Sequence, residues 1–281
     1  MKFAKKLTAA LFATILALGL TACDDNDKAD GAKSQLAQIQ EAGKVRIGVF
    51  SDKPPFGYVD GQGKSQGFDV EIGKEIAKDL VGDENKAEFV LVEAANRAEY
   101  LLSNKVDIIL ANFTVTPARK EVVDFANPYM KVALGVVSKE GSVITDIQQL
   151  TDKTLLVNKG TTADAFFTKN YPNIKLLKFE QNTETFDALK DGRGDALAHD
   201  NTLLFAWAKN NPGYTVGVRS LGKQEFIAPA VQKNQPELLK WLNDEIVKLT
   251  KEGKIKAAYE KTLHPVYGDT ISESDILVDY Q

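Results

Sequence analysis

The run from residue 111 to 119 (ANFTVTPAR) combines groups that could bind an anion. Thr116 followed by Pro117 predicts a helix with Thr116 as its N-cap and Pro117 as its first residue. Arg119 then falls in the first turn, where a cation opposes the helix dipole. An anionic ligand would explain that placement, because helix N–H groups, the Thr114 hydroxyl and the guanidinium could converge on one carboxylate. The alternative is a surface arginine paired with Glu121 or Asp124.

A second candidate anion site lies in the run from residue 158 to 164 (NKGTTAD). Gly160 permits close backbone approach, and Thr161 and Thr162 stand at the start of a predicted helix. This is either another anion-binding helix end or a well-made cap. It is not a P-loop, because the sequence G-x-x-x-x-G-K-[ST] does not occur.

The third candidate is Asp200, which follows the apolar run 196–198 and His199. Asp200 either caps the next helix or, if desolvated, accepts an ammonium group. Placed opposite Arg119 it would match the two ends of a zwitterion, of which a free α-amino acid is the simplest. We expect His199 to be a hydrogen-bonded structural residue.

The elements that position these residues alternate between strands and helices. Strands are expected at 45–49, 89–92, 106–110, 154–157, 174–179 and 196–198, and helices at 70–81, 96–103, 162–170, 183–190, 236–252 and 255–263. This order predicts an α/β fold with mostly parallel sheets. Asn112 and Asp200 each stand five positions past an Asp, at the exit of a short apolar strand. Ligands bind beyond the carboxyl ends of such strands, so separate lobes could face each other across a cleft.

The composition excludes several classes of function. The 281 residues carry 35 Lys+Arg and 39 Asp+Glu, a net charge of −4, whereas a dedicated nucleic-acid binder would have a basic surplus. One Cys and two His residues provide no material for a disulfide, a zinc cluster or a His-rich metal site. We therefore expect a soluble globular body with no metal, no cofactor and no nucleic-acid partner.

The first 22 residues are predicted to be a lipoprotein signal peptide. A basic start precedes apolar residues 7–20, which span about 21 Å as a helix, too short for a hydrocarbon core of about 30 Å. Leu20-Thr21-Ala22-Cys23 resembles the bacterial lipobox, so Cys23 is the expected acylation site. Residues 23–34 are then a flexible tether, and Asp24 favours retention at the inner membrane. The protein is expected at the periplasmic face of a bacterial membrane.

The body resembles the polar amino-acid family of extracellular solute-binding proteins, the capture subunits of ABC importers. The matching pieces occur in order across about 44–268: Pro54-Pro55-Phe56, 67–72 (GFDVEI), 113–119 (FTVTPAR), 123–129 (VDFANPY), Gly160-Thr-Thr162 and Asp200. The resemblance implies two α/β lobes of the type II periplasmic-binding-protein fold, joined by a two-strand hinge. Lobe 1 would be 44–131 plus 227–268, and lobe 2 would be 132–226.

The resemblance also implies roles for individual residues. Arg119 and Thr114 would hold the α-carboxylate with the backbone N–H of Thr162, whereas Asp200 and the carbonyl of Asn112 would receive the α-ammonium. Arg97 aligns with a residue that contacts the ligand side chain in binders of acidic amino acids. The first loop would wall the side-chain pocket with Phe50, Lys53 and Phe56.

Within the family, the runs 46–56, 93–97 and 198–202 look most like cysteine-type binding lipoproteins. Cysteine is therefore the preferred ligand, followed by aspartate or glutamate, for which Arg97 argues, and then cystine. We expect a monomer that binds without catalysis and delivers its ligand to an ABC permease. The enzymatic alternative is a periplasmic cyclohexadienyl dehydratase, acting on arogenate or prephenate, on the same scaffold.

The expected anchor is testable by metabolic labelling with radioactive palmitate. Wild-type protein should carry the label and the Cys23→Ser variant should lose it, because no other cysteine is present. Label retained on the variant would refute acylation at Cys23.

Overall fold

The computed structural model describes residues 33–268 and 271–280. The expected signal peptide, Cys23 and the expected tether up to residue 32 lie outside this range. Ser34, the last residue of that expected tether, caps a helix by accepting a hydrogen bond from Ala37 N. In the described part of the chain, no helix is long and apolar enough to cross a membrane. The same residues hold no group of three or more His, Cys, Asp or Glu side chains that could bind a metal ion.

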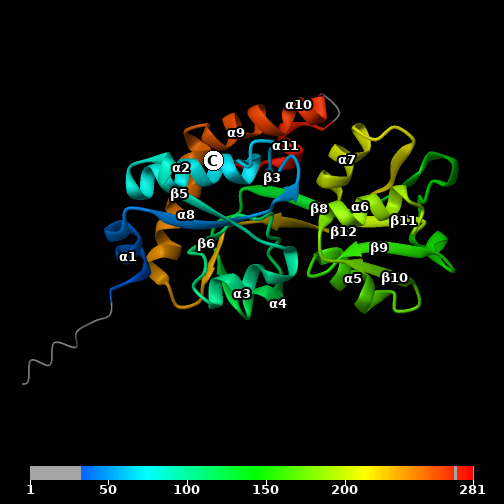
Figure 1. Ribbon diagram of the computed structural model, residues 1–281, viewed down its shortest axis with the longest axis horizontal. Helices are drawn as coiled ribbons and strands as arrows, with labels where there is room; N and C mark the ends of the chain where they lie inside the picture. The colour runs from blue at the N-terminus through cyan, green and yellow to red at the C-terminus, as the bar shows by residue number, and fades with distance from the viewer. Residues whose placement is uncertain (1–32, 269–270, 281) are drawn as a thin grey trace, which may run out of the picture. The chain divides into compact units, whose positions relative to one another are not determined.

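Two five-stranded sheets organise the described chain (Figure 1). In spatial order, the first contains β5 (Ala87–Leu91), β1 (Val45–Val49), β6 (Ile108–Ile109), β13 (Ala230–Gln232) and β7 (Val123–Phe125). The second contains β10 (Lys175–Phe179), β9 (Thr154–Asn158), β11 (Ala196–Asp200), β8 (Met130–Lys139) and β12 (Tyr214–Ile227). Each has three parallel strands, β5–β1–β6 and β10–β9–β11, extended by antiparallel neighbours. The predicted parallel pairing is therefore confirmed.

Helices cover both sheets. The α-helices are α1 (Gln35–Ala42), α2 (Phe68–Val81), α3 (Arg97–Leu102), α4 (Pro117–Lys120), α5 (Thr162–Asn170), α6 (Asn182–Lys190), α7 (Asn201–Lys209), α8 (Pro236–Lys251), α9 (Lys254–Thr262), α10 (His264–Tyr267) and α11 (Glu273–Ile276). Short 3₁₀ helices occupy Glu84–Lys86, Ala94–Asn96, Glu140–Ser142 and Ile147–Leu150. Figure 1 shows α5, α6 and α7 around the second sheet, and α1, α2, α3 and α8 around the first.

Local sequence rules explain where several helices begin and end. Helix α2 buries Ile72, Ile76 and Leu80 at helical spacing and ends at Gly82 in the left-handed conformation. Helix α8 begins at Pro236, as the missing N–H of proline favours. The expected strand at 45–49 and helix at 162–170 are confirmed residue for residue.

The chain passes between the two sheets through β8 and β12. These long strands pair antiparallel from Met130↔Ile227 to Lys139↔Tyr214, with register shifts on the way. One isolated bridge, Thr114↔Ile227, connects the end of β12 to the region of the first sheet. Figure 1 shows both strands running between the two groups of elements. This pair is the two-strand hinge of the expected fold.

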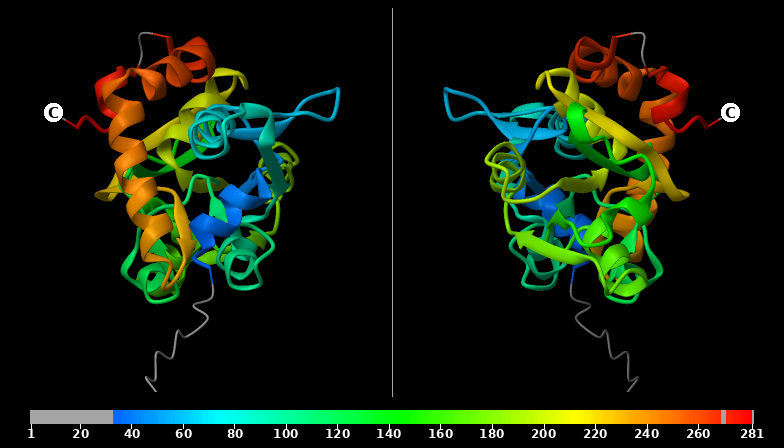
Figure 2. Two further views of the ribbon diagram at one scale, coloured as in Figure 1. Left: turned by 90° about the vertical axis from the view of Figure 1, so that its left-hand side faces the viewer. Right: turned by 90° about the vertical axis from the view of Figure 1, so that its right-hand side faces the viewer.

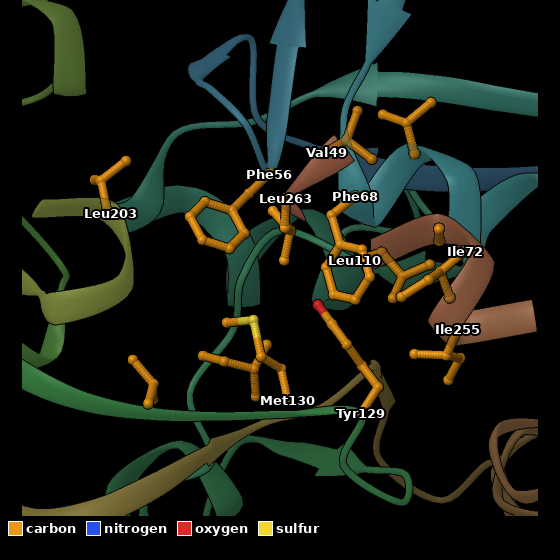
Figure 3. Packing of buried hydrophobic residues seen from close by; sticks show 14 of the residues in the cluster. Val49, Phe56, Phe68, Ile72, Leu110, Tyr129, Met130, Leu203, Ile255 and Leu263 are labelled. Atoms are coloured by element: carbon orange, nitrogen blue, oxygen red, sulfur yellow. The ribbon is translucent and has the colours of Figure 1, made fainter. Parts of the chain in front are cut away.

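One hydrophobic cluster includes residues of both sheets. It contains Ile47 and Leu110 from the first sheet region, and Leu156 and Leu197 from the second. Figure 3 shows part of it, with Phe56, Phe68, Tyr129 and Met130, and Leu203 of α7 belongs to the same cluster. The rings of Phe68 and Tyr129 lie 5.9 Å apart, centroid to centroid. The first loop, α2 and α7 therefore share one apolar interior.

The C-terminal segment is fastened to the start of β8. Val278 N donates to Tyr129 O over 3.3 Å, and Leu277 forms a bridge with Met130. Tyr280 Oη donates to Pro128 O over 2.6 Å, and Lys131 Nζ donates to Ser274 O over 2.9 Å. This strap holds the first-sheet end of the hinge strand.

A small antiparallel sheet of β2 (Asp52–Lys53), β3 (Gly57–Val59) and β4 (Ser65–Gln66) precedes α2. Its β3–β4 hairpin projects from the body in the side views (Figure 2). Gly67 then turns the chain with φ +116°, and a Cβ there would lie 2.4 Å from Phe56 O. No other residue would fit without displacing backbone, so Gly67 fixes the first loop against α2.

Gly67→Ala should lower the free energy of unfolding by about 2 kcal/mol or more, because it adds backbone strain and a clash. Gly61→Ala is the matched control in the same hairpin, since a Cβ there meets nothing within 4 Å. Urea unfolding of both variants measures the effect. Equal stabilities would contradict this role of Gly67.

Candidate functional site

Arg119 reaches from the first sheet to the second. The Thr116 hydroxyl accepts from Arg119 N over 3.2 Å, as the predicted N-cap requires. The guanidinium donates through Nη1 to Thr114 O (2.7 Å) and through Nη2 to Gly160 O (2.9 Å). Burial lowers the pKa of Arg119 to about 10. The alternative pairing is wrong within the described residues, where Arg119 makes no ion pair and Asp124 pairs with Lys233.

Gly160 lets the start of α5 pack closely against Ala95, which follows β5 of the first sheet. Its φ is +72°, and a Cβ would lie 2.5 Å from Ala95 Cα. Thr161 is the N-cap of α5, because its hydroxyl accepts from Asp164 N over 3.2 Å. A surface cavity of about 350 Å³ is lined in part by Arg119, Gly160, Thr161 and Thr162. The cap interpretation is thus confirmed, and the same residues face Arg119.

Asp200 does not use its side chain to cap α7, although it occupies the N-cap position. Its Oδ2 accepts from Lys53 Nζ over 2.9 Å, in a pair where each side chain is at most 5% exposed. Burial opposes the carboxylate, but the Lys53 ammonium outweighs it and holds the pKa of Asp200 well below its usual range. Asp200 is therefore ionised at neutral pH, with Lys53 as its cationic partner.

Lys53 connects Asp200 with Asn112. Its Nζ also donates to Asn112 Oδ1, and it lies 5.3 Å from the ring centre of Phe50 and 5.8 Å from that of Phe56. Burial lowers the pKa of Lys53, and Asp200 offsets this only in part. Phe50 and Phe56, which we expected beside Lys53 around the ligand side chain, therefore both lie near the Lys53 ammonium group.

Arg97 is buried and donates to backbone carbonyls. Its Nε donates to Ala94 O (3.0 Å), Nη1 to Ala111 O (3.0 Å) and Asn112 O (3.1 Å), and Nη2 to Gly160 O (3.2 Å). Each of its nitrogens thus has an acceptor in the protein. Its role as a contact for a ligand side chain stays a prediction.

Phe113 lies under both arginines, a contact that the sequence did not single out. The guanidinium carbons of Arg97 and Arg119 lie 4.3 and 4.6 Å from the centre of its ring. The negative face of an aromatic ring stabilises such cations. Burial, followed by repulsion from Arg119, lowers the pKa of Arg97.

Asp69 is a second functional residue that the sequence reasoning did not assign. It is fully buried, accepts from Tyr129 Oη over 2.7 Å and from Asn112 N over 2.8 Å. Asn112 has a φ of +45°, and Asp69 holds its backbone in place. Burial raises the pKa of Asp69 to about 7, against the effect of both hydrogen bonds. Its only sequence signal is the run Gly67-Phe68-Asp69 within the family resemblance.

His199 is confirmed as a hydrogen-bonded buried residue, because its Nδ1 accepts from Asp200 N over 2.7 Å. Burial and the nearby Lys53 lower its pKa, so His199 is neutral. Thr114 and Asn112 are also buried. The structure therefore brings Arg119, Asp200, Asn112, Lys53 and Gly160 together from two sheets.

Two α/β lobes with opposite charges meeting between them define a two-lobe solute-binding protein. A sequence model of the bacterial extracellular solute-binding proteins, family 3, matches residues 45–265. The chain belongs to that family. The expected fold class, α/β with two lobes and a two-strand hinge, is confirmed, and the lobe boundaries remain a prediction.

Solved structures and curated relatives agree with this membership. A solute receptor for L-cysteine of Neisseria gonorrhoeae is 66% identical, with a TM-score of 0.86 over 88% of this chain and 100% of that chain. The cysteine-binding protein of Campylobacter jejuni is 58% identical, with a TM-score of 0.87 over the same shares. The ABC transporter glutamine-binding protein GlnH of Bacillus subtilis is 34% identical over 90% of this chain and 93% of its own. All three are named for binding a ligand.

The raised pKa of Asp69 predicts a pH-dependent stability. The folded chain holds this proton up to about pH 7, whereas the carboxyl of an unfolded chain loses it near its ordinary pKa of 3.8. Stability from this group is therefore present at low pH and lost as the pH rises toward 7, by about 1.4 kcal/mol per unit of pKa difference.

Asp69→Asn removes this titration and keeps a side chain of the same shape. Urea unfolding at about pH 4.5 and about pH 8 should show a larger loss of stability in the wild type than in the variant, by a few kcal/mol. Parallel pH profiles would contradict the assignment.

Proposed function

We propose that this family member captures free L-cysteine between its lobes and delivers it to an ABC importer. In this proposal Arg119, Thr114 and the N–H of Thr162 hold the α-carboxylate. Asp200 and the carbonyl of Asn112 receive the α-ammonium. The protein acts as a monomer, anchored outside the cytoplasmic membrane through acylated Cys23, with the inner membrane favoured by Asp24.

The observation that carries the proposal is the convergence of opposite charges from two lobes, the half-buried Arg119 and the buried Asp200. Arg119 is held on α4, beside the first sheet, and Asp200 at the end of β11 in the second. The two charges are close enough to interact, since the Asp200 carboxylate partly offsets the effect of burial on the pKa of Arg119. A zwitterion bridging them would gain two charge-assisted contacts in a site shielded from water.

Similarity supports cysteine over the other amino acids. The receptors from N. gonorrhoeae and C. jejuni, at 66% and 58% identity, are both described as cysteine binders. GlnH, described as a glutamine binder, is only 34% identical. The hydrogen bonds that Arg97 donates to backbone carbonyls support cysteine over aspartate or glutamate, because each of its nitrogens already has an acceptor.

The electrostatics favour binding over dehydratase chemistry. A dehydratase acting through Asp200 would need a protonated carboxyl as its proton donor. Lys53 holds the pKa of Asp200 below its usual range, so the carboxyl is ionised. An ionised Asp200 suits an ammonium partner. Turnover of prephenate by the purified protein would contradict this view.

A thermal-shift screen tests the ligand. Protein that has been unfolded and refolded, to remove any retained ligand, is scanned against all amino acids and cystine. We expect a rise in the melting temperature with L-cysteine, because ligand binding to the folded state stabilises it. A shift with aspartate or glutamate only would overturn the choice.

Charge-removing variants test the site. Arg119→Ala and Asp200→Asn should each weaken cysteine binding by about 30-fold or more, since losing one partner of a buried charge pair costs about 2–5 kcal/mol. The matched controls are Lys120→Ala and Asp191→Asn, two exposed neighbours. Calorimetry measures affinity and circular dichroism checks folding. Near-native affinity in either site variant would reject its role.

A further inference from the structure

Asn112 carries a buried donor with no acceptor. The residue is 1% exposed, and its other polar groups are all engaged. Its N donates to Asp69 Oδ2, its O accepts from Arg97 Nη1, and its Oδ1 accepts from Lys53 Nζ. Only Nδ2 lacks a hydrogen-bond partner. A buried amide N–H without an acceptor costs free energy, which a ligand atom could recover.

The orientation of this amide is set by its neighbour. Oxygen and nitrogen of an asparagine side chain are assigned from the surrounding hydrogen bonds. Turning the amide over would place its NH₂ group against the Lys53 ammonium, two donors with no acceptor between them. Oδ1 therefore faces Lys53, and Nδ2 stays available beside the same ammonium group.

The surroundings favour a negatively charged acceptor. Three cationic side chains meet here, from Lys53, Arg97 and Arg119, and both fully buried carboxyls are engaged, Asp200 by Lys53 and Asp69 by Tyr129. The charged and titratable groups here whose pKa values are shifted by burial and by one another are Lys53, Asp69, Arg97, Arg119, Tyr129, His199, Asp200 and the half-buried Glu225. A further anion would lower the mutual repulsion of the cations.

On the basis of the proposed function, we propose that the site binds L-cysteine as its thiolate, with the sulfur against Asn112 Nδ2 and Lys53 Nζ. The carboxylate and ammonium of the ligand are assigned to Arg119 and Asp200, so the side chain is the group left for this donor and cation. The S–H bond breaks, its electron pair stays on sulfur, and the proton leaves to the solvent. Asn112 and Lys53 are then the residues that determine specificity.

This assignment separates cysteine from its close analogues. Serine has the same size but a hydroxyl that does not ionise at neutral pH, so it would leave the Lys53 ammonium without its anion. The alkyl analogue 2-aminobutyrate has no acceptor in its side chain. Both should bind at least tenfold more weakly than cysteine.

Ultraviolet difference spectroscopy tests the ionisation directly. The experiment uses the Cys23→Ser chain, in which the ligand is the sole source of thiol because Cys23 is the single cysteine. At pH 7 about 3% of a free thiol with a pKa of about 8.5 is ionised. We expect the thiolate absorbance to show that most of the bound cysteine is ionised, an enrichment of roughly 30-fold relative to that free fraction.

Variants connect the signal to the two residues. Lys53→Met should reduce the thiolate fraction of bound ligand, while Lys64→Met, at an exposed lysine of the same hairpin, should leave it unchanged. Asn112→Asp keeps a side chain that tolerates positive φ but replaces the donor with an anion. It should weaken cysteine binding at least tenfold.

The outcomes distinguish this inference from the proposed function. Cysteine bound with the spectrum of a neutral thiol, with calorimetry confirming occupancy, would overturn the thiolate and leave the function standing. A thiolate fraction unaffected by Lys53→Met would overturn the role of Lys53. A refolded protein that binds no cysteine would overturn both.

Discussion

The buried ion pair between Lys53 and Asp200 is the contact on which the site depends. Neither charge could stay desolvated alone, because an unpaired buried ion costs several kcal/mol. The pair joins the first loop to the end of β11, and so joins the two lobes. Gly160 adds a second connection, because its carbonyl accepts from both Arg97 and Arg119. The interface between the lobes is therefore held by charges rather than by apolar contact alone.

Local rules predicted the parts of the site that are built locally. Thr116, Pro117 and Arg119 follow the rules of helix capping, and Thr161 caps α5 as its position suggests. The partner of Asp200 could not be found this way, because Lys53 lies 147 positions away in the chain. Only the family resemblance placed Lys53 near the ligand. Whether a charged side chain pairs with a distant partner depends on its burial, and burial is difficult to predict from a single sequence.

The hinge strands show a similar limit for the fold. Strand β8 is buried on both faces over most of its length, so it lacks the alternation that marks a half-exposed strand. Strand β12 contains register shifts and Gly222 with a φ of +79°, which break any simple period. Strand β1 and helix α5 were predicted from their own residues because each follows one regular pattern. Arg97 illustrates the same point, since the carbonyls that hold it come from separate segments.

The C-terminal strap has a mechanical consequence. Residues 274–280 contact β8 at Met130 and Lys131, and Tyr280 donates a hydrogen bond to the carbonyl of Pro128. A strand that is fixed at one end bends mainly beyond the fixed residues. Met130 and Lys131 are therefore restrained by the C-terminal segment, and we expect β8 to bend more easily beyond Lys131, toward the second sheet. Without the contacts of residues 274–280, bending could extend to Met130 and Lys131, and Asp200 would be positioned less accurately relative to the first sheet.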